Sequence, residues 1–253
     1  MLLLLPPSET KRDGGSGAPL SLDALSFEEL SAPRAQLTRA VVDLAGDHDA
    51  MMRALKLGPR QALEVARNRD LATSATMPAI DRYTGVLYDA LDAPSLDESA
   101  RGFGARTVVV HSALFGLVGA LDPLPAYRLS HDSRVPGLRL KAFWREPLAL
   151  VLDRTPGLIV DLRSEGYAEL GPAPTRPDSV YVRVVSIDGT GRKRALNHFN
   201  KQAKGRFTRA VLEQRPEADT VEELLDWAAG AGFAMQLGED RGASLPREVE
   251  LVA

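Results

Sequence analysis

Three short apolar runs in this sequence each end at side chains that are able to do chemistry. Hydroxyls and carboxylates follow the runs 2–5 and 158–162, and the run 107–110 leads through a Gly- and Pro-rich loop to an acid, a tyrosine and an arginine. Carboxylates that lie close together raise the pKa of one of them, which suits general acid–base catalysis. The candidate cleft residues are Ser8, Glu9, Ser112, Asp122, Tyr127, Arg128, Ser164 and Glu165.

The elements that must position these side chains are buried strands. The three runs are apolar without alternation, which is typical of strands covered on both faces of a sheet. Helical segments separate them, and this arrangement favours parallel pairing. The carboxyl ends of parallel strands meet at one edge of the sheet, where ligands of open α/β folds bind. The sequence therefore predicts a single mixed α/β domain over residues 1–253, with a central, partly parallel sheet flanked by helices and a cleft at the strand ends.

The same polar residues also have a structural interpretation, which the sequence leaves open. Glu9 and Glu165 are equally suited to cap helices or to pair with Arg128 without taking part in a site. In the cleft interpretation, Arg128 is buried or lines the cleft, and it pairs with Asp122, Glu165 or a bound anion.

A second kind of chemistry, phosphate binding, is indicated between residues 55 and 65. The sequence Leu-Lys-Leu-Gly-Pro-Arg lies between two helical stretches and resembles the turn of a helix-hairpin-helix DNA-binding motif. In that motif, backbone N–H groups and a helix N-terminus hold a phosphate. We therefore assign Lys56, Gly58 and Arg60 to DNA binding, with an ordinary Gly-Pro helix break as the other interpretation.

The segment 192–212 predicts a basic amphipathic helix. Its apolar residues recur at three- and four-residue steps, and no acidic residue lies between Asp188 and Glu213. Gly205 costs such a helix about 1 kcal/mol, which has a reason if a phosphate or another backbone approaches closely. An ordinary solvated face is the alternative. The candidate DNA-binding residues of this segment are Arg194, Lys201, Lys204, Gly205 and Arg209.

Composition excludes several classes of protein. The 253 residues include no cysteine, and the four histidines lack ligand spacing, so we expect no metal site and no cofactor. The net charge of −3 argues against a protein that coats nucleic acid over its whole surface, so any DNA-binding surface is local. No apolar stretch is long enough to span a membrane, and we expect a cytoplasmic protein with no membrane partner.

Several segments together resemble the YaaA family of peroxide-stress-response proteins. The family's Ser-Pro-Ala-Lys-Thr, Tyr-x-Gly-x-x-Tyr, Ser-Gly-Leu-Tyr-Gly, Asn-Leu-Ala-Ser-x-Glu-Tyr and Lys-x-Ala-Arg-Gly motifs have counterparts here in the same order. Glu9 stands where the family has a lysine, with Lys11 close by, and Phe115 replaces the family's tyrosine. The matching segments are 6–11, 83–88, 112–116, 121–122, 127–129, 161–167 and 201–205.

The resemblance implies a cytosolic protein linked to peroxide stress and to the limitation of free iron. It also implies a family-specific α/β fold with a helix-hairpin-helix-like element and a basic cleft that binds DNA. The sequence contains no iron-ligand cluster, so we expect an indirect route to iron homeostasis, such as protection of DNA.

Two functional hypotheses follow. The leading one is a stress protein that binds DNA without sequence specificity. The alternative is an enzyme that acts on a nucleotide, a nucleobase or a related small metabolite in the strand-end cleft. A deep pocket bounded by Ser8, Ser112, Arg128 and Glu165 favours the enzyme, whereas a flat basic groove from Lys56 to Lys201 favours DNA binding.

Overall fold

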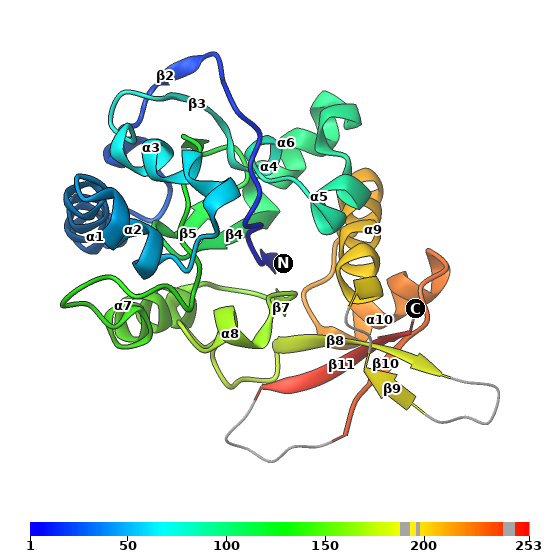
Figure 1. Ribbon diagram of the computed structural model, residues 1–253. Coiled ribbons are helices and arrows are strands. Elements are labelled where there is room, and N and C mark those ends of the chain that lie inside the picture. Colours follow the sequence, from blue (N-terminus) through cyan, green and yellow to red (C-terminus); the bar gives the residue numbers. More distant parts are fainter. Residues whose placement is uncertain (188–192, 196–197, 240–245, 253) are drawn as a thin grey trace.

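The computed structural model describes residues 1–187, 193–195, 198–239 and 246–252 (Figure 1). Its main sheet is mixed and mostly parallel, with the strand order β10-β11-β8-β7-β1-β4-β5 and with β9 beside β8. The strands of this sheet are β1 (Leu2–Leu5), β4 (Val108–Ser112), β5 (Gly116–Gly119), β7 (Ile159–Asp161), β8 (Ser179–Ile187), β9 (Lys193–Ala195), β10 (Met235–Leu237) and β11 (Arg247–Val252). This is the α/β class that the sequence predicts.

The first strand is the centre of the fold. β1 pairs in parallel with β4 on one side and with β7 on the other, so that Leu4 lies opposite both Val109 and Asp161. The predicted parallel pairing of the three apolar runs is therefore confirmed. β4 includes His111 and Ser112, which were expected to follow the strand.

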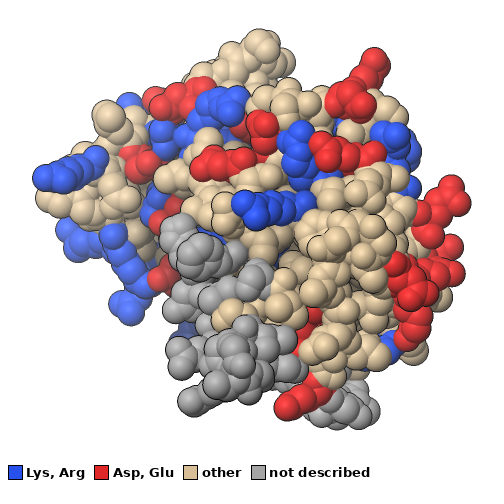
Figure 2. Space-filling view, turned by 90° about the vertical axis from the view of Figure 1, so that its right-hand side faces the viewer, with Lys and Arg blue, Asp and Glu red and all other residues tan. Residues whose placement is uncertain are grey.

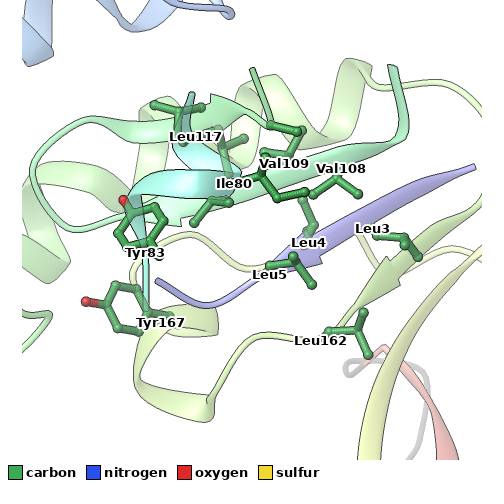
Figure 3. Close-up of a cluster of buried hydrophobic side chains, with 14 of the residues drawn as sticks. Leu3, Leu4, Leu5, Ile80, Tyr83, Val108, Val109, Leu117, Leu162 and Tyr167 are labelled. Atoms are coloured by element: carbon green, nitrogen blue, oxygen red, sulfur yellow. The ribbon is translucent and has the colours of Figure 1, made fainter. Parts of the chain in front are cut away.

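The apolar core surrounds β1 on both faces. Leu3, Leu4 and Leu5 are fully buried, as expected for a strand of a covered parallel sheet. Figure 3 shows these leucines among apolar side chains of β4 and β5, with Tyr83 and Tyr167 on the side where β1 exits beyond Leu5. The exit of the central strand is thus framed by aromatic rings.

A small antiparallel sheet lies apart from the main one. Its strand order is β2-β3-β6. Its strands are β2 (Gly17–Pro19), β3 (Ala75–Pro78) and β6 (Pro123–Leu124).

Helices occur on several sides of the main sheet (Figure 1). The α-helices are α1 (Ser31–Ala45), α2 (His48–Ala54), α3 (Leu63–Arg69), α4 (Ala79–Arg82), α5 (Val86–Leu91), α6 (Glu98–Thr107), α7 (Leu140–Arg154), α8 (Glu165–Ala168), α9 (His198–Gln214) and α10 (Val221–Gly230). Short 3-10 helices are η1 (Leu22–Ala24), η2 (Glu28–Leu30), η3 (Pro59–Gln61) and η4 (Ala93–Ser95). Within the described residues, no helix has the length and apolar character needed to cross a membrane.

The basic segment 192–212 does not form one helix. Residues 193–195 form β9, which pairs with β8, and α9 begins only at His198. The buried face of α9 also differs from the expected one, because Lys204 and Gly205 lie on it. Gly205 packs against α5: a Cβ at this position would clash with the Leu87 carbonyl oxygen and would lie 2.9 Å from Ala90 Cβ. The glycine therefore allows close contact between two backbones, which is one of the two reasons predicted for it.

Candidate functional site

A cleft of about 450 Å³ lies where β1 and β7 end, and one side of it is formed by α9. This is the strand-end position at which ligands bind in open α/β sheets. The segment 6–10 lines it after β1, and Leu162 and Ser164 line it after β7. The remaining walls include His131, Tyr167 of α8, and Asn200, Lys201 and Lys204 of α9.

Lys204 is the buried cation of this cleft. Only 3% of the residue is exposed, and Nζ donates a hydrogen bond to the Arg163 carbonyl oxygen at 3.2 Å. Nζ also lies 5.6 Å from the centre of the Tyr181 ring. Burial lowers the pKa of Lys204 to about 8, although the Asp161 carboxylate acts in the opposite direction. No carboxylate of the described residues lies within ion-pair distance of this ammonium.

Two further polar side chains reach the cleft from the first turns of α9. Lys201 is exposed, and no ion pair joins it to a described residue. Asn200 is partly buried, and its Oδ1 atom has no hydrogen-bond partner among the described residues although solvent does not reach it. This part of the cleft therefore offers two ammonium groups and an amide that lacks a full set of partners.

A buried ion pair holds the carbonyl group that Lys204 contacts. Arg163 is fully buried and forms two hydrogen bonds with the Asp161 carboxylate, at 2.8 and 2.6 Å. Arg163 also contacts His111 Nδ1 at 2.8 Å, and burial keeps the pKa of that histidine well below its ordinary value. A neutral His111 accepts this hydrogen bond from the guanidinium. The backbone around Arg163 is thereby fixed, which positions the ammonium of Lys204.

A second buried lysine, Lys11, supports the opposite wall. Its Nζ donates to the carbonyl oxygens of Ser8 at 3.0 Å and Glu9 at 3.4 Å, and it lies 4.0 Å from the centre of the Tyr127 ring. Burial lowers the pKa of Lys11 to about 7, and the neighbouring Arg128 guanidinium adds to this effect. Because its ammonium is turned to carbonyls of the segment that lines the cleft, Lys11 fixes the shape of that segment.

The predicted cleft residues divide into two groups. Ser8, Glu9 and Ser164 line the cleft. Ser112 and Tyr127 instead lie in the core, where their hydroxyls are 2.7 Å apart.

Among the predicted charged residues, Glu9 has the partner that the structural interpretation named, whereas Asp122 and Glu165 have other partners. Arg128 is only 9% exposed and pairs with Glu9, not with Asp122 or Glu165. Asp122 accepts hydrogen bonds from two backbone N–H groups, those of residues 26 and 119, and so anchors a loop. Glu165 is exposed and lies 3.3 Å from Arg183. The expectation that these carboxylates converge on Arg128 is therefore wrong, because each carboxylate has a nearer partner.

The predicted DNA-binding residues of α9 also divide. Lys201 and Lys204 line the cleft, whereas Gly205 is packed against α5. Arg209 donates to the Leu91 carbonyl oxygen at 2.9 Å and pairs with Glu213 at 2.8 Å, so it ties α9 to its surroundings. The side chain of Arg194 lies outside the described residues.

The hairpin residues lie in the connection between α2 and α3, which includes the short helix η3. Lys56 pairs with Asp132 at 2.6 Å, and both side chains are about half exposed. Gly58 N–H donates to the side chain of Gln61 at 3.1 Å, and Arg60 is exposed. On the face of the molecule seen in Figure 2, the described Lys and Arg side chains are interspersed with Asp and Glu rather than gathered into one band.

Sequence reasoning did not identify Lys11, His131, Tyr167 and Asn200 as site residues. Lys11 follows the first strand within a recognised motif, which was the available signal. Asn200 directly precedes Lys201, but nothing in the local pattern distinguishes it from a solvated residue. In the part of the chain that the structure describes, no three His, Asp or Glu side chains come together as metal ligands. The donors of the cleft instead suit an anion.

Comparison with known proteins identifies the family of this chain. Residues 1–237 match the family described as peroxide stress protein YaaA. A UPF0246 protein of Corynebacterium efficiens is 41% identical over 250 residues, which are 97% of this chain and 98% of that protein. A UPF0246 protein of Corynebacterium glutamicum (strain R) is 40% identical over 242 residues, or 93% of this chain and 95% of its own length. A UPF0246 protein of Streptomyces coelicolor is 39% identical over 240 residues, which cover 93% and 92% of the two chains. The chain therefore belongs to the family of peroxide stress protein YaaA, as its motifs predict.

Proposed function

We propose that this protein serves the peroxide stress response by binding DNA, and that its strand-end cleft takes a backbone phosphate. The observation that carries the proposal is the pair Lys201 and Lys204, which line one concave site and have no carboxylate partner among the described residues. The acid of the lining, Glu9, is engaged by Arg128, and the two carboxylates whose charges act on Lys204, Asp161 and Glu165, are engaged by Arg163 and Arg183. The net positive charge of this wall therefore has to be balanced by a ligand or by solvent ions.

The energetics of Lys204 support an anionic ligand. Removing an ammonium from water destabilises its charged form, which is why the pKa of Lys204 falls to about 8. A phosphate beside it would restore the charged form and would bond to both lysines with charge-assisted hydrogen bonds. The hydroxyl of Ser164, at the start of α8, is a further donor in the same cleft.

The salt dependence of DNA binding tests this proposal. Neutralising both cleft lysines with Lys201→Ala and Lys204→Met should lower the slope of log K against log salt by about 2, near 0.9 per lost phosphate contact. Methionine keeps most of the lysine volume, so the buried position remains filled.

Arg209→Gln is the matched control, because it removes one positive charge from the same helix at a side chain that is engaged internally. Its salt slope should equal that of the wild type. A double variant that is folded by circular dichroism and keeps the wild-type slope would refute the proposal.

Protection of DNA is the consequence that we propose for the cell. A protein that covers the phosphate backbone keeps iron-bound peroxide away from it, which links DNA binding to iron toxicity without an iron site. Wild-type protein should reduce strand breaks in plasmid DNA treated with ferrous iron and peroxide, and the double lysine variant should not. Equal protection by both proteins would separate the stress function from the cleft.

An enzyme that acts on a nucleotide, a nucleobase or a related small metabolite is the second candidate. Its support is that Lys204 is buried beneath a cleft of small-molecule size and has a pKa of about 8. Charge-mediated DNA binding requires neither the burial nor the lowered pKa, whereas both are common in enzyme active sites. Calorimetric titration with nucleoside monophosphates, followed by product detection, tests it. If the protein binds a free nucleotide tightly and does not bind DNA, the enzyme is the better supported of the two functions.

A further inference from the structure

The cleft has two chemically different walls. The wall formed by α9 carries Lys201, Lys204 and the amide of Asn200. The rest of the lining combines polar groups, Ser8, Glu9, Thr10, Ser130 and Ser164, with an apolar and aromatic part that comes from Pro6, Pro7, Leu162, His131 and Tyr167. A simple phosphate site needs only the first wall, so the second one requires its own explanation.

The aromatic part of that second wall is rigid. The rings of His131 and Tyr167 meet edge to face, with centroids 5.1 Å apart, and Tyr167 makes a similar contact with the buried His111 ring at 5.6 Å. Gly166 holds His131 from the other side, because a Cβ at this glycine would lie 2.6 to 2.9 Å from three atoms of the imidazole ring. Tyr167 is only 7% exposed and supports the His131 ring, which is partly exposed. A fixed aromatic ring of this kind is a surface on which a nucleobase stacks.

The amide of Asn200 adds a group that can read a base edge. Its buried Oδ1 has no partner among the described residues, and an unpaired buried acceptor has a free-energy cost. A side-chain amide offers a donor and an acceptor side by side, which is the pattern that matches the edge of a nucleobase. A ligand that supplies the missing partner would remove this cost.

We propose that the cleft holds one nucleotide that has left the base stack of a DNA strand. Its phosphate lies at Lys201 and Lys204, its base packs on the wall of His131 and Tyr167, and Asn200 bonds the edge of the base. The inference rests on the proposed DNA binding and specifies which part of the DNA enters the protein.

The size of the cleft requires the base to be unstacked. A volume of about 450 Å³ falls within the range of sites for single small molecules, about 300–1,000 Å³, and a duplex does not fit into it. Extruding a base requires it to be unpaired and unstacked, and this costs least at a mismatch or in a single strand. The protein should therefore bind a duplex with one mismatch about tenfold more tightly than the matched duplex, since about 1.4 kcal/mol corresponds to a factor of ten.

The experiment measures binding and unstacking in the same samples. Matched and mismatched duplexes carry 2-aminopurine next to the target nucleotide, where the probe brightens once its neighbour leaves the stack. Binding is followed separately through the anisotropy of a terminal dye. The expected result is preference for the mismatch together with brightening in both duplexes, stronger in the mismatched one.

Two variants connect this signal to the cleft. Asn200→Ala should lower affinity for the mismatched duplex about tenfold and abolish the brightening, while the salt slope stays as in the wild type, because both phosphate contacts remain. Gly166→Ala displaces the His131 ring on the opposite wall. It should likewise lower affinity for the mismatched duplex about tenfold and abolish the brightening, with an unchanged salt slope. Arg209→Gln, which changes neither wall, should behave as the wild type.

The outcomes separate this inference from the proposed function. Wild-type protein that binds both duplexes equally and leaves the probe dim would overturn the extruded nucleotide but keep DNA binding. No binding to either duplex would overturn both. If Asn200→Ala fails to fold, Gly166→Ala carries the comparison alone, and unchanged brightening in that variant counts against the inference.

Discussion

Helix α9 and the hairpin at residues 55–65 each place basic side chains around a single glycine, yet their charges and backbones meet different partners. In α9, Gly205 lets the helix lie against the Leu87 carbonyl group, and Lys204 comes to line the cleft. In the hairpin, a Cβ on Gly58 would meet only the side-chain oxygen of Gln61, at 3.8 Å. The first glycine is required by packing, and the second is not.

The backbone amides of the two regions differ in the same direction. In the hairpin, the N–H groups of residues 56 and 57 donate to carbonyl oxygens of α2, and those of residues 58, 61 and 62 donate to acceptors within the turn. They are therefore engaged before any phosphate arrives. Among the described residues, the cations of the cleft have no carboxylate partner, and Lys204 has only one hydrogen bond, to the Arg163 carbonyl oxygen. The two segments have similar compositions, and the sequence of each predicts phosphate binding. They differ in how many donor groups remain unpaired and available to a ligand.

The largest effect that tests this comparison is on folding. Gly205→Ala should destabilise the protein by about 3 kcal/mol, at the upper end of the range for overpacking, because the added methyl group meets backbone rather than a movable side chain. Gly58→Ala, where the backbone has an ordinary extended conformation, should change the free energy of unfolding by less than about 0.5 kcal/mol. Urea denaturation measures both. Equal effects would show that the two glycines are equivalent.

The second effect concerns the buried charge of Lys204. Between its ordinary pKa of 10.5 and a value of about 8, the penalty for holding the ammonium in the folded protein is on the order of 3 kcal/mol, at 1.36 kcal/mol per pH unit. Lys204→Met removes this penalty together with the hydrogen bond to Arg163, so we expect a net gain of about 1–2 kcal/mol near neutral pH. Under the proposed function, the same substitution should weaken DNA binding. A residue that reduces stability while serving a ligand is the expected signature of a functional position.

The pH dependence gives the sign of this contribution. Because the pKa of Lys204 is lower in the folded protein, the unfolded chain binds more protons between about pH 8 and 10.5, and stability rises with pH over this window. Lys11 adds a similar rise that begins near pH 7. The stability gain of Lys204→Met should therefore shrink between about pH 7 and pH 9.5. A variant that is less stable than the wild type at both pH values would contradict the assignment of a buried, destabilising charge.

The strands and their common edge were predictable because they depend on local patterns. An apolar run such as 2–5 cannot be placed except inside a sheet, and helices between such runs favour parallel pairing. Ser8 and Ser164 then follow strands at one edge, and both line the cleft.

The charge partners were not predictable, because they depend on contacts between distant segments. The rotation of α9 is set by its packing on α5, about 115 residues earlier in the chain, and this decides that Lys204 is buried. The pairing of Arg128 with Glu9 was one of the interpretations that the sequence left open, and the contact between these distant segments selects it. The burial of Lys11 above the Tyr127 ring has no local signature at all.

The third effect is on the pH dependence of DNA binding, which distinguishes the lysines of the cleft from the arginine of the hairpin. An anion favours the charged form of Lys204, so DNA affinity should fall as the pH rises through about 8, and Lys204→Met should remove this fall. Lys11 titrates near pH 7 but directs its ammonium to carbonyl oxygens, so Lys11→Met should keep the dependence around pH 8. Arginine stays charged throughout this pH range, so Arg60 of the hairpin should add nothing to the pH dependence of DNA affinity. Affinities of the wild type and both variants, measured at constant salt from about pH 6.5 to about pH 9.5, show which lysine is responsible for the pH dependence.

The smallest effect is expected at the hairpin itself. Arg60 is exposed and is the cation of the turn that has no ion pair with a described residue, since Lys56 is paired with Asp132. One exposed arginine can add a single phosphate contact, so Arg60→Gln should lower the salt slope by at most about 0.9 and should weaken binding alike for every DNA sequence. Because the amides of the turn are already engaged, no further loss should follow from Gly58→Ala. If Arg60→Gln instead lowers the slope by as much as the double substitution of Lys201 and Lys204, the hairpin and not the cleft is the principal phosphate site, and the ranking of the two regions is reversed.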